Sequence, residues 1–166
     1  MDATSHIRPG YGTVTPFVIV RGAAEFIEFT TRAFDAEELG RMGEDGAIGH
    51  AEVRIGDSVV MLFDSKPDWP WTPSFLRLYV PDCDATLRQA VDAGATVLTP
   101  PGDMPWGDRS CRVRDPFGNL WWVMTHVEDL TPEEEGRRWG DPVYTAALES
   151  HENAEFFPRE PEGAGR

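Results

Sequence analysis

The sequence predicts an α+β fold of two tandem βαβββ modules, which form a curved mixed sheet around a central cleft with the helices on the outside. Strand-forming and helix-forming segments follow one another in the order β-α-β-β-β. The same order then returns after about 60 residues, so that Val20 and Val80 hold equivalent places. One such module leaves a sheet face bare, and a second module can cover that face or form a cleft with it.

The first module begins with a strand and continues with a helix. Residues 14–21 are β-branched and aromatic, which is typical of a strand. Residues 22–36 place apolar side chains mostly three and four positions apart, which predicts an amphipathic helix. Turn sequences then separate three further strands, at 37–42, 47–55 and 58–64.

The second module repeats this pattern. We expect a strand at 74–80 and a helix at 82–94, which ends at a glycine in a C-cap position. Three more strands are predicted at 95–101, 109–115 and 120–126.

The remaining segments flank or join the modules. The chain divides into an N-terminal extension (1–12), the first module (13–64), a linker (65–73), the second module (74–127) and an acidic C-terminal helix and tail (128–166). Thr131 is the expected N-cap of that helix, with proline at its first position. We expect the tail from residue 149 onward to be poorly ordered or docked on a partner.

The charge of the chain bears on the kind of partner it can bind. The chain has 15 basic and 29 acidic side chains, a formal net charge of −14, and half of that charge follows residue 127. This balance disfavours nucleic acid, because affinity for nucleic acid comes largely from neutralising phosphates. It favours a cationic ligand, although an acidic surface is explained as well by solubility.

The expected location is the cytoplasm. The sequence has no apolar run long enough to span a membrane and no N-terminal secretory signal. Cys83 and Cys111 lack the spacing of a metal site, so we expect free thiols in a reducing compartment.

Strand alternation selects the side chains expected to line the cleft. Aromatic and sulfur-containing side chains are mixed there with arginines, which suits a largely apolar ligand held by a few polar anchors. The predicted ligand-binding residues are Phe17, Met61, Phe75, Arg77, Trp106, Arg112 and Trp122. Charged pairs on neighbouring strands could instead only satisfy one another. Trp106, in a proline-rich loop, could stack on a planar ligand or form a dimer contact.

Four segments have the order and motifs of a known superfamily. They are VTPFVIVRGAAEFIEFTTRAFDAEE, GHAEVRIGDSVVMLFD, FLRLYVPDCDATLRQAVDAGATVLTPP and WGDRSCRVRDPFGNLWWVMTH. Over about residues 12–127 the chain resembles the vicinal oxygen chelate superfamily, which includes glyoxalase I, extradiol dioxygenases, fosfomycin-resistance enzymes and bleomycin-binding proteins. It is most similar to the PhnB-like group.

The resemblance implies where a metal would bind. Enzymes of the superfamily hold a divalent metal with His, Glu or Gln at one position on each of four strands. The matching positions here are Thr15, Met61, Phe75 and Trp122, and none of them is an ordinary ligand for such a cation. A one-residue shift in any of these strands introduces no carboxylate or imidazole. We therefore expect no metal and no cofactor, with Trp121 in the core and Trp122 in the cleft.

Two functions follow from the resemblance. The first is a metal-independent, bleomycin-resistance-like protein that binds a hydrophobic small molecule, such as an antibiotic or other natural product, in an aromatic cleft. The second is a glyoxalase-like lyase or isomerase acting on a small metabolite, with His50 as general base and Glu52 orienting it. His50 could also be a hydrogen-bonded histidine of the sheet. Binding is favoured over catalysis, a protein-interaction role for the acidic tail is weaker, and the resemblance implies a homodimer.

Overall fold

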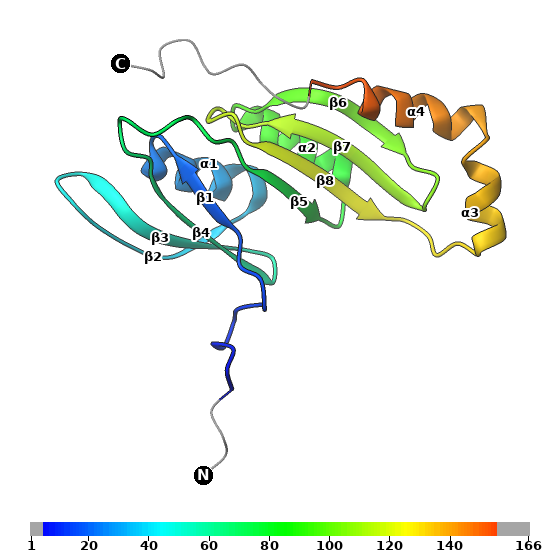
Figure 1. Cartoon of the computed structure of the whole chain (residues 1–166). Coiled ribbons are helices and arrows are strands. Elements are labelled where there is room, and N and C mark those ends of the chain that lie inside the picture. Colours follow the sequence, from blue (N-terminus) through cyan, green and yellow to red (C-terminus); the bar gives the residue numbers. More distant parts are fainter. Residues whose placement is uncertain (1–4, 156–166) are drawn as a thin grey trace. The chain divides into compact units, whose positions relative to one another are not determined.

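The computed structural model describes residues 5–155, which form two compact units, one ending at Pro73 and one beginning at Ser74. Each unit contains one βαβββ module (Figure 1). The predicted α+β class with two tandem modules is confirmed, whereas the shared cleft stays a prediction. Among the described residues, no helix has the length and apolar character needed to cross a membrane.

The first module is a four-stranded mixed sheet with one helix. Its elements are β1 (Phe17–Val20), α1 (Ala23–Phe34), β2 (Glu37–Glu44), β3 (Ala47–Ile55) and β4 (Ser58–Asp64). The strand order is β1-β4-β3-β2, and β1 runs parallel to β4. The apolar face of α1 is buried, as are Ala51 and Val53 on β3. The helix therefore covers one face of the sheet, as the alternation of β3 predicts.

The Asp64 side chain ties three parts of the first module together. One carboxylate oxygen accepts hydrogen bonds from the backbone N–H groups of Gly22 and Ala23 at 3.0 and 2.8 Å, and the other accepts from Ile48 at 2.8 Å. Gly22 has a φ of 92°, which a residue with a side chain rarely adopts, and it has no capping side chain of its own. Asp64 therefore satisfies the free donors at the start of α1.

The second module repeats this arrangement. Its elements are β5 (Phe75–Tyr79), α2 (Cys83–Asp92), β6 (Thr96–Asp103), β7 (Asp108–Arg114) and β8 (Leu120–His126). The order is β5-β8-β7-β6, with β5 parallel to β8. Cys83 on α2 and Cys111 on β7 are buried with their sulfur atoms 3.3 Å apart and joined by a hydrogen bond and not by a disulfide, so both are free thiols as predicted.

Two helices follow the second module. Helix α3 (Pro132–Arg138) begins after Thr131, whose side chain accepts a hydrogen bond from the Glu134 N–H, so the predicted N-cap is confirmed. Helix α4 (Pro142–Glu152) runs beside β6 (Figure 1). It includes residues 149–152, the beginning of the tail that was expected to be poorly ordered or docked on a partner. Residues 156–166 of that tail lie outside the described residues.

The turn before β8 is organised around the buried Asp115. Its carboxylate accepts hydrogen bonds from the backbone N–H groups of Phe117 and Asn119, the Asn119 amide and the Trp121 indole N–H. Burial raises the pKa of Asp115, and these four donors oppose that rise. Trp121 is fully buried, as predicted, because its indole both fills the core and bonds this carboxylate.

Replacing Trp121 by alanine should lower the free energy of unfolding by about 3–5 kcal/mol, because it leaves a large cavity and removes a donor from Asp115. Trp122→Ala is the matched control and should cost less, because Trp122 is only half-buried. Urea unfolding of both variants measures the difference. A loss in Trp122→Ala as large as that in Trp121→Ala would contradict the assignment of the two faces.

Candidate functional site

The face of the first sheet opposite α1, called here the first face, presents a row of aromatic side chains. Pairing places Phe17 beside Met61, and Met61 beside Glu52. The Phe17 ring lies 5.3 Å from the Phe63 ring, and the Phe63 ring lies 6.0 Å from the Trp69 ring. Phe17 remains 49% exposed. This side of the sheet therefore presents partly exposed aromatic side chains.

Polar groups lie beside this aromatic row. His50 Nε2 is 3.1 Å from Glu52 Oε1, and the His50 ring is 6.2 Å from the Phe17 ring. The Tyr11 hydroxyl donates a hydrogen bond to the other Glu52 oxygen, and Arg8 lies 3.9 Å from the carboxylate. The hydrogen bond from Tyr11, followed by that from His50, lowers the pKa of Glu52. The two residues predicted as base and orienting carboxylate are thus in contact, and Glu52 is ionised.

A hollow of about 360 Å³ lies where the N-terminal segment approaches the first face. It is lined by Met61 from β4 and by residues of the N-terminal extension and the stretch after it: His6, Ile7, Arg8, Tyr11, Gly12 and Thr13. The volume is at the lower end of the range for small-molecule pockets. Met61 is thus both one of the positions equated with a metal ligand and part of a hollow.

The face of the second sheet opposite α2, called here the second face, is built around Trp122. The Arg112 guanidinium carbon lies 4.1 Å from the centre of the Trp122 ring, and that of Arg77 lies 5.2 Å from it. The Trp122 indole N–H donates to Ser110. Phe75, on the edge strand β5, is 45% exposed. Four residues predicted to bind a ligand therefore belong to one sheet face, and Arg77 and Arg112 both contact Trp122.

Helix α4 lies on the second face. Its His151 is buried, and the imidazole lies 6.1 Å from the Trp122 ring. His151 Nε2 is 3.0 Å from Ser110 Oγ, and the His151 carbonyl accepts a hydrogen bond from Arg112 at 2.5 Å. Desolvation lowers the pKa of His151 and Arg112 lowers it further, whereas the hydrogen bond with the Ala147 carbonyl opposes this shift. Arg112 and Trp122 are thus in contact with the chain's own C-terminal helix.

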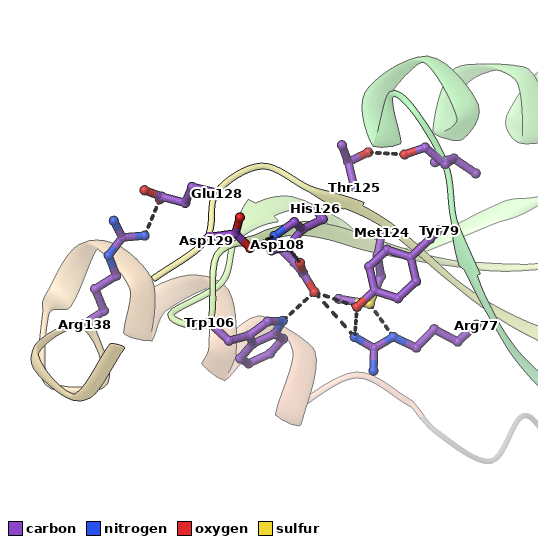
Figure 2. Close-up of polar contacts among 11 residues, drawn as sticks. Arg77, Tyr79, Trp106, Asp108, Met124, Thr125, His126, Glu128, Asp129 and Arg138 are labelled. Carbon is purple, nitrogen blue, oxygen red and sulfur yellow. Dashed lines mark hydrogen bonds and ion pairs between the residues drawn. The ribbon is translucent and has the colours of Figure 1, made fainter. Parts of the chain in front are cut away.

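A second polar cluster surrounds Asp108 at the end of β7 (Figure 2). The buried carboxylate accepts hydrogen bonds from the Trp106 indole at 2.9 Å, the Tyr79 hydroxyl at 2.9 Å and His126 Nδ1 at 2.8 Å, and Arg77 lies 3.6 Å away. The predicted ligand-binding residue Trp106 therefore belongs to this cluster. Asp108 and His126 are paired across β7 and β8, which brings their side chains together. Aligning these two strands in the sequence could have predicted this contact.

His126 is the titrating member of this cluster. Its second nitrogen, Nε2, lies 3.0 Å from Asp129, whose side chain is fully exposed. The hydrogen bond that His126 donates to Asp108, followed by the one it donates to Asp129, raises the pKa of His126. The imidazolium form therefore links β8 to the segment that leads into α3.

The donors present do not fit a divalent metal. The four positions that the resemblance equates with metal ligands hold a threonine, a methionine, a phenylalanine and a tryptophan, none of which supplies a charged oxygen or an imidazole. Within residues 5–155, no group of three or more His, Cys, Asp or Glu side chains is arranged to hold a metal ion. The first face offers aromatic rings beside the Glu52 carboxylate and the His50 imidazole, and the second face offers the Trp122 ring beside two guanidinium groups.

The sequence matches a family and several relatives. Residues 6–123 match the family described as Glyoxalase/Bleomycin resistance protein/Dioxygenase superfamily. An uncharacterized protein of Mycobacterium bovis is 40% identical over 133 residues, which cover 73% of this chain and 88% of that protein. An uncharacterized protein of Mycobacterium tuberculosis strain H37Rv has the same identity over the same length, with 78% of that protein covered.

Solved structures share the fold. TioX from Micromonospora sp. ML1 is 25% identical with a TM-score of 0.59, and the match covers 72% of this chain and 100% of TioX. A family enzyme from Burkholderia phytofirmans PsJN has a TM-score of 0.57 at 15% identity, covering 71% and 98%. The fosfomycin resistance protein FosX from Mesorhizobium loti has a TM-score of 0.53 at 19% identity, covering 74% and 95%. At these identities the last two show a common fold alone.

The raised pKa of His126 predicts a stability that depends on pH. The ion pair with Asp108 should stabilise the fold fully below the ordinary histidine pKa of about 6.5, and this contribution should disappear as the pH rises through the higher folded-state value. The difference in free energy of unfolding between the unchanged protein and His126→Gln should therefore shrink from pH 5.5 to pH 9, measured by urea unfolding. Asp129→Asn should move this decline to lower pH. A difference that grows with pH would contradict the assignment.

Proposed function

Because the chain belongs to the glyoxalase/bleomycin resistance protein/dioxygenase superfamily, we propose that it binds a hydrophobic small molecule on the first face without a metal ion. The observation that supports this most is the row of aromatic rings from Phe17 to Trp69, in which Phe17 is 49% exposed and pairs with Met61, one of the four positions where the resemblance implies a metal ligand. Apolar surface of this kind gains free energy when an organic molecule removes it from water. Since the superfamily includes bleomycin resistance proteins, an aromatic natural product such as an antibiotic is the ligand class proposed.

The polar groups beside the row would orient such a ligand. Glu52 and His50 lie at one end of the aromatic contacts, and the Glu52 carboxylate is ionised. A few polar groups in an apolar site are the usual source of ligand orientation and specificity. A ligand with a cationic or hydrogen-bond-donating group beside its aromatic part would suit this arrangement.

A glyoxalase-like lyase or isomerase is the second candidate function. It is favoured by the 3.1 Å contact between His50 and Glu52, which is the geometry of a histidine base held by a carboxylate. Incubation of a candidate ligand with the protein separates the two functions, because a binding protein returns the ligand unchanged. Turnover that is lost in His50→Gln would support the enzyme.

The homodimer implied by the resemblance is part of this proposal. Superfamily members pair two βαβββ modules into each cleft, either within one chain or between chains. Sedimentation equilibrium of the purified chain would show a mass of twice 18.5 kDa for the dimer.

The neutral fluorescent probe 1-N-phenylnaphthylamine tests the binding function. We expect the probe to bind with enhanced fluorescence and Phe17→Ala to weaken it about tenfold, since the ring contributes roughly 1.5 kcal/mol when a ligand covers it. Val91→Ala is the control, because Val91 is a part-exposed apolar residue on α2 and belongs to neither of the two sheet faces. Equal binding by Phe17→Ala and the unchanged protein would place the ligand elsewhere and contradict the proposal.

A further inference from the structure

The packing of α4 against β6 depends on Gly102, which has no side chain. A Cβ atom added at Gly102 would lie 2.6 Å from the Cβ of Ala147, which is closer than carbon atoms approach one another. Because Gly102 has no Cβ, the helix can lie directly against the strand, and its last turn then reaches β7 and β8. The contact of α4 with the second face therefore depends on a small residue on each element, Gly102 on β6 and Ala147 on α4.

The end of α4 presents one residue to the centre of the second face. His151 places its imidazole beside the Trp122 ring and within 3.4 Å of both the Thr99 and the Ser110 hydroxyl oxygens. Its backbone carbonyl accepts a hydrogen bond from Arg112. One residue thus supplies a planar heteroaromatic ring together with an oxygen acceptor.

The electrostatics of this contact favour an electron-rich oxygen. Arg112 is only 4% exposed, and desolvation lowers its pKa. A buried cation is stabilised by hydrogen bonds to acceptors, and the carbonyl end of a helix carries partial negative charge. A carboxylate would interact more strongly than a carbonyl, because a guanidinium binds a carboxylate with two parallel hydrogen bonds.

We propose that His151 and the end of α4 occupy a second binding site, which takes a planar aromatic or heteroaromatic carboxylate. The ring of that ligand replaces the imidazole beside Trp122, and its carboxylate replaces the His151 carbonyl on Arg112. Such a ligand and α4 compete for the second face. The apparent affinity for the ligand is therefore the intrinsic affinity multiplied by the fraction of molecules in which α4 has left that face. The proposal rests on the proposed function in one respect, since both take the sheet faces opposite α1 and α2 as ligand-binding surfaces.

The test compares variants that unseat α4. Ala147→Leu enlarges the side chain that contacts Gly102, and Ala146→Leu is the matched control, since Ala146 is an exposed neighbour on the same helix. We expect Ala147→Leu to bind 2-naphthoate at least tenfold more tightly than the unchanged protein by isothermal titration calorimetry. The Ala146→Leu control should bind like the unchanged protein. Hydrogen exchange of the α4 amides should accelerate in Ala147→Leu and stay unchanged in Ala146→Leu.

Two further measurements assign the binding to this face. Gly102→Val unseats the helix from the strand side and should raise the affinity for 2-naphthoate as Ala147→Leu does, which guards against a folding defect in either variant. Adding Arg112→Gln to Ala147→Leu should weaken the binding of 2-naphthoate at least tenfold relative to Ala147→Leu alone. Naphthalene-2-methanol, which has the same ring without the carboxylate, should bind Ala147→Leu at least tenfold more weakly than 2-naphthoate.

The outcomes separate this inference from the proposed function. Faster exchange of α4 without tighter binding of 2-naphthoate would overturn the second site, as would α4 exchange that stays slow in both Ala147→Leu and Gly102→Val. Neither result bears on the first face, which is tested by 1-N-phenylnaphthylamine in the unchanged protein. Failure of that neutral probe alone would overturn the proposed function and leave the carboxylate site standing.

Discussion

The alternation of side chains along β7 and β8 is the constraint on which the second module depends. Because neighbouring residues of a strand point to opposite faces, Cys111 and Trp121 lie with α2, whereas Arg112 and Trp122 lie with α4. The two neighbouring tryptophans of β8 therefore have different roles, because they point to opposite faces of the sheet. Trp121 fills the core and bonds Asp115, while Trp122 provides an aromatic surface between polar partners.

Two carboxylates, the part-buried Asp64 and the buried Asp115, hold strand and helix ends in register with this pattern. Asp64 in the first module and Asp115 in the second each satisfy backbone donors that the chain leaves unpaired where it changes direction. Both stand at the end of a strand, so the same device recurs in the two modules. A turn fixed in this way cannot slip by one residue, and a slip would exchange the two faces of the strand that follows.

The sequence was sufficient for the fold and for the faces of the strands, because both follow from local periodicity. It predicted the order βαβββ twice, the N-cap at Thr131 and the burial of Trp121. It did not predict α4, because residues 142–152 show only a weak amphipathic pattern, and the contacts of His151 join residues about forty positions apart. The partnership of Asp108 with His126 was missed for the same reason, since it depends on the pairing of β7 with β8.

The two sheet faces differ in the sign of the charge that each holds beside its aromatic rings. On the first face Glu52 is ionised and accepts hydrogen bonds from Tyr11 and His50. On the second face Arg112 is buried and donates to the end of α4. In each case a segment outside the βαβββ module supplies a partner for the charge, because a charge at an apolar surface is costly without one. Under the two proposals, a ligand of the first face would supply donors or a cation, and a ligand of the second face would supply a carboxylate.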